Sequence, residues 1–245
     1  MQNIENNVIW VTGSSRGIGL EIAKALSSAG KSKIAICGRS VIDVSDLITH
    51  FGFENVKNDN IKYYQVDFEI PEQIFSIYEK IKNDFGKINV LVNNTGLGLF
   101  KPFRESTLHD YDKIMNTNTK STFITSQLVI KDFIEANKGM IVNILSIASE
   151  KTFKNASIYA ASKSAIKAMM NVVREETRKF NIDIVNIYPG ATATEIWDSE
   201  YLEEYKYRMM DAEEVAQITK DVILNCINSK ATIEDVIIRP KMGDL

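Results

Sequence analysis

The sequence predicts a doubly wound α/β fold, in which helices cover both faces of a parallel β-sheet. Short apolar runs rich in β-branched residues alternate with longer amphipathic segments along the whole chain. The apolar runs are nearly continuous, as strands buried on both faces require. A glycine-rich turn joins the first apolar run directly to the first amphipathic segment, which is how strand and helix follow one another in such folds.

Seven apolar runs are the expected strands, and they lie at residues 8–12, 33–37, 61–66, 88–93, 140–145, 182–188 and 235–239. Amphipathic patterns between these runs predict helices at residues 18–29, 71–85, 108–135, 157–180 and 212–228. No linker rich in Gly, Ser or Pro and no internal repeat divides the chain. We therefore expect residues 1–245 to form a single domain around a seven-stranded sheet.

Residues 191–210 depart from this alternation, because they make an unusually long connection between the sixth strand and the last helix. The apolar residues of this segment are Ile196, Trp197, Tyr201, Leu202, Tyr205, Met209 and Met210. One interpretation is a lid that closes over a substrate. The other is a short amphipathic helix packed on the surface, and the sequence leaves both open.

Charge and hydrophobicity exclude several classes of protein. The 29 Lys and Arg residues nearly balance the 32 Asp and Glu residues, so the net charge of −3 provides no basic field for nucleic acid or an anionic membrane. A hydrophobic content of 44% with 25% charged residues is too apolar for a disordered chain. No signal sequence and no run of ~18 apolar residues is present. We expect a cytoplasmic protein that binds neither nucleic acid nor membrane.

Cysteine and histidine are scarce. Cys37 and Cys226 lie far apart, in no spacing typical of a metal site or a disulfide framework, which fits a reducing compartment. His50 and His109 have no Cys or carboxylate groups beside them at ligand spacing, and we interpret both as surface residues. We therefore expect no catalytic metal.

The glycine-rich turn after the first strand has the spacing G-x-x-x-G-x-G. Glycines allow a tight turn and close approach of the backbone to a pyrophosphate, and the following helix N-terminus offers free N–H groups. The alternative is a purely structural turn. We expect dinucleotide binding through Gly13, Ser15, Arg16, Gly17, Ile18 and Gly19.

Arg39 stands at the end of the second strand, about 20 residues beyond the glycines, where the residue that contacts the adenosine ribose is expected. An acidic side chain there would bind a free 2′-hydroxyl, whereas the guanidinium of Arg39 suits a 2′-phosphate. Arg16 would add a second cation. The pair favours NADP(H) over NAD(H), and the alternative is an ordinary solvated arginine.

Tyr159 and Lys163 lie four residues apart on a predicted helix, so their side chains share a face. A nearby ammonium is expected to lower the pKa of a tyrosine from about 10 and make it a useful acid or base. Tyr78 and Lys82 have the same spacing, and we interpret them as an exposed helix face. Only Tyr159 follows shortly after a serine, Ser146, at the end of a central strand, where open α/β sheets bind ligands.

These residues resemble those of the short-chain dehydrogenase/reductase family over essentially the full length of the chain. The matching landmarks, in order, are residues 12–19, Asp67, residues 93–96, Asn118, Ser146, residues 159–163, Pro189, Gly190, Thr192 and Thr194. The resemblance implies a single-domain Rossmann fold. It also implies a homodimer or homotetramer that associates through the helices at residues 108–135 and 157–180.

The resemblance implies a mechanism of hydride transfer between NADP(H) and a carbonyl or alcohol. Tyr159 would exchange a proton with the substrate oxygen, and Ser146 would hydrogen-bond to that oxygen. Lys163 would lower the pKa of Tyr159 and bind the nicotinamide ribose, while Asn118 would hold the proton relay in place. The further cofactor-binding residues that it implies are Asp67, Phe68, Asn94, Gly96, Pro189, Gly190, Thr192 and Thr194.

Two departures from the family pattern narrow the subfamily. Thr95 stands where alanine is usual, and the last strand lacks the T-G-x-x-x-x-V-D-G-G-like ending of fatty-acid 3-oxoacyl reductases. Within the family the chain looks most like bacterial NADP-dependent reductases similar to sepiapterin reductase and to 3-hydroxy-acid dehydrogenases. The alternatives are a 3-oxoacyl-[acyl-carrier-protein] reductase and a sensor or scaffold protein that binds NADP(H) without turnover.

The candidate substrate pocket is mostly apolar and aromatic. Its expected residues are Ser146, Leu97, Leu99, Phe100, Phe153, Tyr188 and Trp197. Such a lining suits a neutral or planar carbonyl compound, for example a dicarbonyl or a pterin. Lys151 and Lys154 would instead favour a carboxylate, which keeps a 3-hydroxy acid open.

Overall fold

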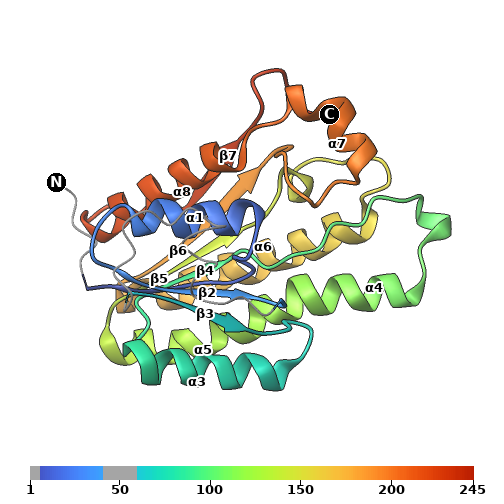
Figure 1. The fold of residues 1–245 in the computed structure, drawn as a ribbon. Helices are drawn as coiled ribbons and strands as arrows, with labels where there is room; N and C mark the ends of the chain where they lie inside the picture. Colours follow the sequence, from blue (N-terminus) through green and yellow to red (C-terminus); the bar gives the residue numbers. More distant parts are fainter. Residues whose placement is uncertain (1–5, 41–59) are drawn as a thin grey trace.

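The computed structural model describes residues 6–40 and 60–245, and its seven strands form one parallel sheet. The strand order is β3-β2-β1-β4-β5-β6-β7, which confirms the predicted fold class (Figure 1). The strands are β1 Val8–Val11, β2 Lys33–Gly38, β3 Ile61–Gln65, β4 Val90–Asn93, β5 Gly139–Ile144, β6 Ile182–Pro189 and β7 Asp235–Ile238.

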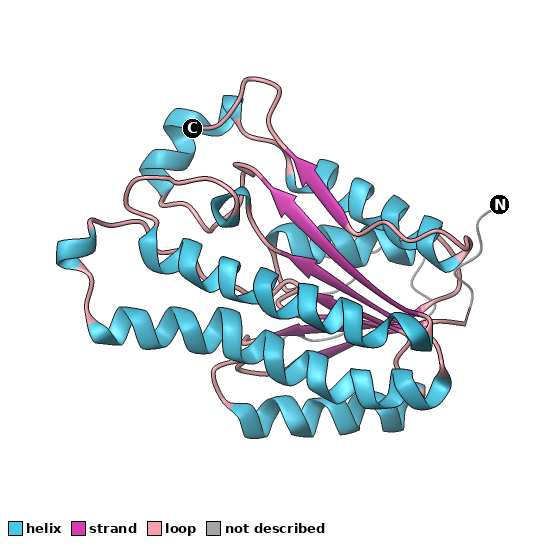
Figure 2. Cartoon of the chain, turned by 180° about the vertical axis from the view of Figure 1, so that it is seen from behind, coloured by secondary structure: helices cyan, strands magenta, loops and turns pink. Residues whose placement is uncertain are grey.

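Helices cover both faces of this sheet. The longer helices are α1 Gly17–Ser27, α3 Pro71–Phe85, α5 Ser121–Ala136, α6 Ser157–Thr177 and α8 Ala212–Ile227. Helices α1 and α8 lie on one face, and α3, α5 and α6 lie on the other (Figures 1 and 2). The sheet is therefore doubly wound, as the alternation of apolar and amphipathic segments predicts.

The apolar runs are continuous because successive strand residues enter two different cores. In β1, Ile9 and Val11 pack with α1 and α8, whereas Val8 and Trp10 pack on the opposite face. Trp10 is fully buried, and its Nε1 donates a hydrogen bond of 3.2 Å to the Cys37 Sγ atom. A strand that supplies both cores needs apolar side chains at every position.

The helix predicted at residues 108–135 is interrupted. Helix α4 Leu108–Ile114 runs into a π-helical segment, Met115–Lys120, before α5 begins. Thr122 Oγ1 donates to the Asn118 carbonyl at 2.8 Å, and side-chain bonds of this kind loosen a helical turn. Wide turns of this type are frequent at functional sites, and this one contains Asn118. The expectation of one regular helix was wrong because the pattern of apolar residues does not report such a turn.

The 191–210 segment leaves the sheet and returns to it. Thr192 pairs with Met210 in a parallel β-bridge, and between them lies the short helix α7 Ser199–Tyr205, near the carboxyl end of β6 (Figure 1). The Met210 N–H donates to the Ala191 carbonyl at 3.0 Å. A short helix is therefore present, and closure of the segment as a lid stays a prediction.

A row of polar side chains crosses the sheet from β4 to β7, and all of them except the exposed Asp235 are buried. Asn93, Asn143, Asn186 and Asp235, which we call the amide row, are register partners on neighbouring strands. Nδ2 of Asn93 donates to Oδ1 of Asn143 at 3.0 Å, and Nδ2 of Asn143 donates to Oδ1 of Asn186 at 3.0 Å. Nδ2 of Asn186 reaches Oδ1 of Asp235 at 3.3 Å. Buried amides are costly unless they are paired, so the row disfavours any other register.

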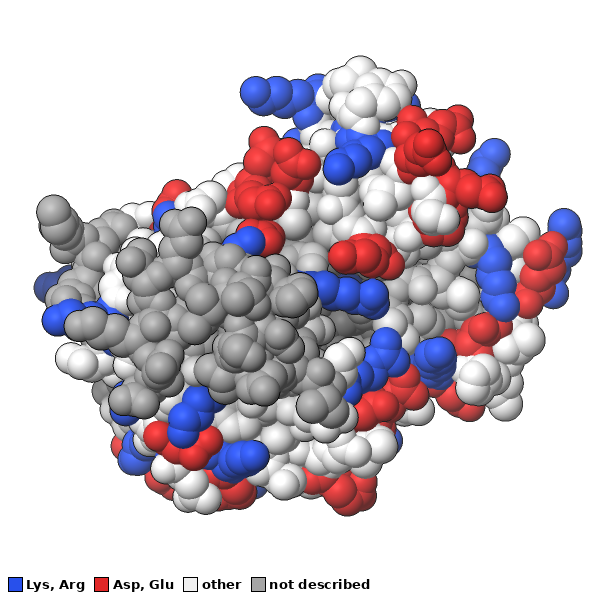
Figure 3. Space-filling view, in the orientation of Figure 1, with Lys and Arg blue, Asp and Glu red and all other residues white. Residues whose placement is uncertain are grey.

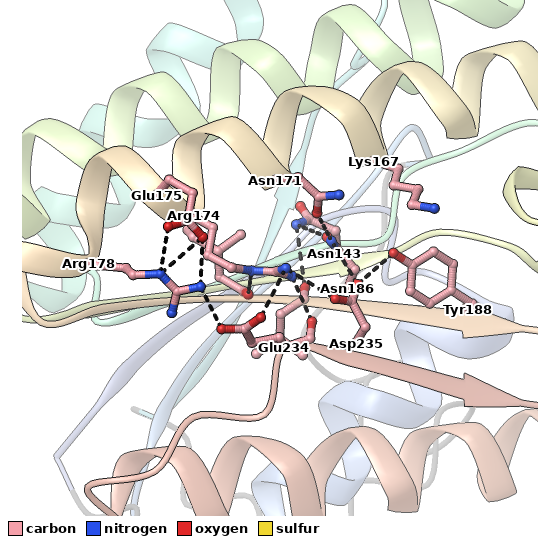
Figure 4. A network of polar contacts seen from close by, with 12 residues as sticks. Asn143, Lys167, Asn171, Arg174, Glu175, Arg178, Asn186, Tyr188, Glu234 and Asp235 are labelled. Carbon is pink, nitrogen blue, oxygen red and sulfur yellow. Dashed lines mark hydrogen bonds and ion pairs between the residues drawn. The ribbon is translucent and has the colours of Figure 1, made fainter.

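Arg174 of α6 fixes the outer end of this row (Figure 4). The buried guanidinium donates from Nε to the Ile184 carbonyl at 2.9 Å and from Nη2 to the Glu234 carbonyl at 2.8 Å. Its Nη1 lies 3.1 Å from Oδ2 of Asp235. Arg174 therefore holds the edge strand β7 against α6 and β6.

Several surface features bear on possible partners. Acidic and basic side chains are interspersed on the face shown in Figure 3. Within residues 6–40 and 60–245, no helix is long and apolar enough to cross a membrane, and no group of three or more His, Cys, Asp or Glu residues could hold a metal. His109 is exposed, and His50 lies outside the described residues.

Replacing Arg174 with Ala is expected to lower the free energy of unfolding by about 3 kcal/mol, because the carbonyls of Ile184 and Glu234 lose their buried partner. Urea denaturation measures this change. Arg178 is the matched control, because it also binds Glu234 but its side chain is 45% exposed. Arg178→Ala should leave stability nearly unchanged, and equal losses in the two variants would contradict the role of Arg174.

Candidate active site

Two adjoining cavities lie at the carboxyl ends of the central strands. The first, which we call the glycine-loop cleft, measures about 270 Å³ and is bordered by the turn after β1 and the ends of β2 and β4. The second, the aromatic pocket, measures about 360 Å³ and lies between the end of β5 and the 191–210 segment. The residues that line both cavities are Ile18, Leu145, Tyr159, Thr194 and Ile196. A ligand in one cavity can thus meet a ligand in the other.

The glycine loop requires glycine for two different reasons. Gly13 and Gly17 have positive φ angles of 58° and 55°, which favour glycine. Gly19 has no room for a side chain, because a Cβ atom there would lie 2.3 Å from Nδ2 of Asn94 and 2.6 Å from the Gly13 carbonyl. That amide donates to the carbonyls of Thr12 and Gly13, at 3.1 and 2.9 Å, and so ties the loop to β4.

The N-terminus of α1 opens beside this loop. In the described part of the chain, its N-cap residue Arg16 makes no side-chain capping bond, so the first-turn N–H groups are free for an anion. Arg16 and Arg39 both line the cleft, together with Asp67 and Phe68. The sequence-predicted cations are therefore brought to the same cavity.

Two hydroxyl groups at the cleft are buried and unpaired. Oγ1 of Thr95 and Oγ1 of Thr117 have no hydrogen-bond partner among the residues that the structure describes, and both residues line the cleft. Buried hydroxyls normally have a partner, so a ligand or water is expected near them. Together with the glycine turn, the arginines and the helix N-terminus, they form a site that fits a phosphorylated dinucleotide.

Tyr159 and Lys163 lie one turn apart on α6, and both are buried. The Ser146 hydroxyl, which follows β5 and accepts a bond of 3.1 Å from the Ala148 N–H, lies near enough to the phenol of Tyr159 to influence its pKa. Nζ of Lys163 donates to the Ile144 carbonyl at 2.8 Å. A Cβ atom on Gly96 would lie 3.3 Å from the same Nζ, so the small residue leaves the lysine accessible from the cleft.

Burial shifts these two pKa values in opposite directions. It raises the pKa of Tyr159, and the nearby Ser146 hydroxyl only partly opposes this. It lowers the pKa of Lys163 to about 8. Nζ of Lys163 is directed at the Ile144 carbonyl, and burial is the largest influence on the pKa of Tyr159, so a lowering of that pKa by Lys163 stays a prediction.

Asn118 is fully buried in the π-helical segment and lines neither cavity. Its Oδ1 accepts from the Leu97 N–H at 2.7 Å, and its Nδ2 donates to the Leu97 carbonyl and to Oγ of Ser162, both at 3.0 Å. The side chain therefore joins the loop after β4 to the turn of α6 that carries Tyr159 and Lys163.

Aromatic rings form one wall of the second cavity. The rings of Phe100 and Trp197 stack at 4.8 Å, and Phe100 also lies 5.6 Å from the ring of Tyr159. Trp197 continues the stack to Tyr201 of α7 at 5.1 Å, and its Nε1 donates to the Thr192 carbonyl at 2.9 Å. The expected pocket residues Phe100, Phe153 and Trp197 all line this cavity.

Tyr188 is not a pocket residue, contrary to the sequence-based expectation. It is 2% exposed, and its hydroxyl donates to Oδ1 of Asp235 at 2.6 Å beside the amide row (Figure 4). The alternation of β6 turns this side chain toward α6. Leu97 lines the glycine-loop cleft and not the aromatic pocket.

The residues at the end of β6 and directly after it lie mostly at the aromatic pocket, and not at the glycine-loop cleft as expected. Pro189, Gly190 and Thr192 line the aromatic pocket, and only Thr194 of the four expected cofactor residues there also lines the glycine-loop cleft. The remaining expected cofactor residues in the glycine-loop cleft are Gly13, Ser15, Arg16, Gly17, Ile18, Arg39, Asp67, Phe68, Asn94, Gly96, Tyr159 and Lys163.

Two lysine interpretations also change. Lys151 pairs with Asp244 at 3.2 Å, so it is not free for a substrate carboxylate.

Lys82 and Tyr78 do not form an exposed helix face, because Tyr78 is buried and donates to Oδ2 of Asp132 on α5 at 2.6 Å. Lys82 binds the same carboxylate at 2.9 Å, so this pair joins α3 to α5.

Sequence reasoning missed several lining residues, among them Thr117, Asp244 and Leu245, whereas Ile196 and Tyr201 belong to the segment that it expected over a substrate. Thr117 directly precedes Asn118, so its neighbour in the sequence was a usable signal. Asp244 offered none, because its position depends on ion pairs with Lys151 and Arg239, two residues far apart in the chain.

Comparisons with known proteins agree with this geometry. A family model described as short chain dehydrogenase matches residues 7–204. A sepiapterin reductase of Chlorobaculum tepidum is 29% identical over 245 residues, which cover 98% of each chain. A gluconate 5-dehydrogenase of Gluconobacter oxydans is 31% identical over 76% of this chain and 71% of its own.

A solved structure supports the same fold. The closed form of a serine dehydrogenase complexed with NADP+ superposes with a TM-score of 0.86 at 22% identity, over 97% of this chain and 96% of that one. The family model spans the glycine loop, Asn118, Ser146, Tyr159 and Lys163. The chain therefore belongs to the short-chain dehydrogenase/reductase family, whose members are oxidoreductases that interconvert carbonyls and alcohols with a nicotinamide cofactor.

Proposed function

We propose that this protein is an NADP(H)-dependent oxidoreductase that reduces a ketone or aldehyde to an alcohol, or catalyses the reverse, with Tyr159 as general acid and base. The observation that carries the proposal is the position of Tyr159. It lines both cavities, and Ser146 lines the aromatic pocket beside it. A substrate oxygen held there would meet a proton donor beside the cofactor cleft.

Tyr159 and Ser146 act on the substrate oxygen in this proposal. When bound, the nicotinamide cofactor supplies or accepts the hydride. In reduction, the Tyr159 hydroxyl donates its proton to the oxygen as negative charge develops there, and in oxidation the phenolate accepts that proton. The raised pKa of Tyr159 keeps the hydroxyl protonated at neutral pH, as a donor requires. Ser146 donates a hydrogen bond that orients the same oxygen.

Lys163 and Asn118 support the proton donor. With a pKa of about 8, Lys163 is largely charged at pH 7, so it favours the phenolate that forms when Tyr159 gives up its proton. We propose that its Nζ also binds the ribose hydroxyls next to the nicotinamide. Asn118 joins Leu97 to Ser162, and so keeps the loop after β4 at a fixed position relative to α6.

The preference for NADP(H) is supported by two arginines in one cleft. Arg39 follows β2 at the expected ribose position, and Arg16 lies in the glycine loop. A guanidinium binds a phosphate more tightly than a ribose hydroxyl, because the hydrogen bonds are charge-assisted. We propose that Asp67 and Phe68 contact the adenosine, while the 189–194 segment and Thr194 in particular contact the nicotinamide half.

The aromatic pocket supports a planar carbonyl substrate such as a dicarbonyl or a pterin, and the sepiapterin reductase relative is consistent with a pterin. A 3-hydroxy acid is the second candidate. Lys154 lines the pocket and forms no ion pair within the described residues, so it is available for a carboxylate. A Lys154→Ala variant that loses activity only with anionic substrates would favour the acid.

We also propose that the 191–210 segment closes over the substrate, because the stack of Phe100, Trp197 and Tyr201 connects it to the pocket.

Residues 1–245 act as one domain in this proposal, since all seven strands share one sheet. Association into a homodimer or homotetramer would cover the exposed side chains of Phe123 on α5 and Val172 on α6. The free thiols of Cys37 and Cys226 fit a cytoplasmic location.

Replacing Tyr159 with Phe is expected to abolish NADPH oxidation with a responsive ketone, at least about a hundredfold, because the only change is the loss of the donated proton. The rate is followed by the absorbance of NADPH. The binding constant of NADPH, measured by calorimetry, should stay nearly the same. Unchanged turnover would show that Tyr159 is not the general acid and base.

Replacing Arg39 with Asp is expected to weaken NADPH binding at least about tenfold more than NADH binding, because the carboxylate repels a 2′-phosphate and accepts from a ribose hydroxyl. Calorimetric titration with each cofactor measures the two constants. An equal loss for both cofactors would show that Arg39 does not bind the phosphate.

Replacing Lys163 with Met is expected to change stability in a pH-dependent way. The folded-state pKa of about 8 lies below the ordinary value of 10.5, so the unfolded chain binds this proton more tightly. The resulting cost to the native protein is fully present below pH 8 and shrinks as pH rises toward 10.5. The Tm of the variant minus that of the native protein should therefore be largest near pH 7 and smaller at pH 10. A difference that is constant with pH would contradict a buried ammonium.

A further inference from the structure

Arg39 stands where the chain leaves the sheet. Gly38, the last residue of β2, still pairs with Gln65 of β3, and its carbonyl accepts from the Val66 N–H at 2.9 Å. The pairing between β2 and β3 ends at Gly38, so Arg39 is not held by hydrogen bonds of the sheet. The position of the guanidinium therefore depends on whatever else holds the backbone of Arg39 and Ser40.

Two side chains of β3 hold that backbone. Nε2 of Gln65 donates to the Arg39 carbonyl at 3.1 Å, and the hydroxyl of Tyr63 donates to the Ser40 carbonyl at 2.8 Å. Tyr63 and Gln65 are two residues apart on the strand, so their side chains emerge on the same face of the sheet. Together they bind the consecutive carbonyls of Arg39 and Ser40.

Tyr63 also lies beside Gly38, which lines the glycine-loop cleft. A Cβ atom on Gly38 would come within 2.6 Å of the Tyr63 hydroxyl and of the Ser15 side chain, so these three residues are in close contact. Burial raises the pKa of Tyr63 to about 12, so the hydroxyl stays a donor at any working pH. The Tyr63 hydroxyl is thus placed between the glycine loop and the backbone that carries Arg39.

We propose that Tyr63 and Gln65 are positioning residues for cofactor selection. They fix the carbonyls of Ser40 and Arg39 so that the guanidinium of Arg39 faces the 2′-phosphate. The inference rests on the proposed role of Arg39 as the phosphate-binding residue. A cofactor without the phosphate makes no use of that orientation, so the two β3 side chains should affect NADPH and not NADH.

The sequence offers a matched control in the neighbouring tyrosine. Tyr64 lies on the same strand, but its side chain points to the other face and donates to Oδ2 of Asp84 on α3 at 2.8 Å. Tyr63→Phe and Tyr64→Phe each remove one hydroxyl from β3. Only the first removes it from the backbone beside Arg39.

Calorimetric titration of NADPH and NADH onto each variant tests the proposal without a known substrate. Tyr63→Phe is expected to raise the Kd for NADPH about five-fold, as the loss of one hydrogen bond predicts, and to leave the Kd for NADH unchanged. Gln65→Leu should act in the same direction. Tyr64→Phe should leave both constants unchanged, even where it lowers Tm.

The same measurement in an Arg39→Ala background separates the two proposals. If Tyr63 acts through Arg39, Tyr63→Phe should have no further effect on NADPH binding in that background. If Arg39→Ala alone leaves the preference for NADPH intact, the role of Arg39 fails. If Arg39→Ala removes the preference but Tyr63→Phe changes nothing, or weakens both cofactors equally, or still weakens NADPH in the Arg39→Ala background, the positioning role of Tyr63 is overturned.

Discussion

The amide row of Asn93, Asn143, Asn186 and Asp235 is the constraint on which the geometry of the site depends. Each amide must be paired because it is buried, and the pairing is satisfied only when β4, β5, β6 and β7 keep one register. The functional groups follow the row within a few residues. Asn94 to Gly96 come after the first amide, the Ile144 carbonyl and Ser146 come after the second, and residues 189–194 come after the third. Because the strands keep one register, the residues that follow them lie together at the carboxyl edge of the sheet.

Electrostatics at this edge is local. A chain with a net charge of −3 has no general attraction for a polyanionic cofactor, and the positive groups gather at the glycine-loop cleft as Arg16, Arg39, Lys163 and the N-terminus of α1. Burial then shifts the pKa values of Tyr159 and Lys163, the two groups to which we assign proton transfer. It raises the pKa of Tyr159, so the phenol keeps its proton, and it lowers the pKa of Lys163 to about 8. A protonated phenol and a weakly acidic ammonium therefore lie one turn apart on α6.

The fold and most of the site follow from local patterns in the sequence. Apolar runs predict strands, and residues that directly follow a strand, such as Ser146 and Arg39, are correctly placed at the carboxyl edge because parallel strands all end there. The features that the sequence did not predict depend on contacts between side chains of different elements or turns. The direction of the Tyr188 side chain depends on its bond with Asp235 of the neighbouring strand. The burial of Tyr78 depends on a carboxylate of α5. The π-helical turn at Asn118 depends on a hydroxyl group in the next turn. Apolar periodicity carries no information on such polar pairs.

The proposed function requires that the protein turns over a carbonyl substrate with NADPH. The most direct measurement is the rate of NADPH oxidation by the unmodified protein across α-dicarbonyls, pterins, 3-oxo esters and semialdehydes, with the reverse reaction followed for 3-hydroxy acids and NADP+. We expect turnover with at least one of these classes, and a lower rate when NADH replaces NADPH. Tight binding of NADPH with no turnover in either direction across the panel would contradict it, and would favour a protein that senses the cofactor without using it.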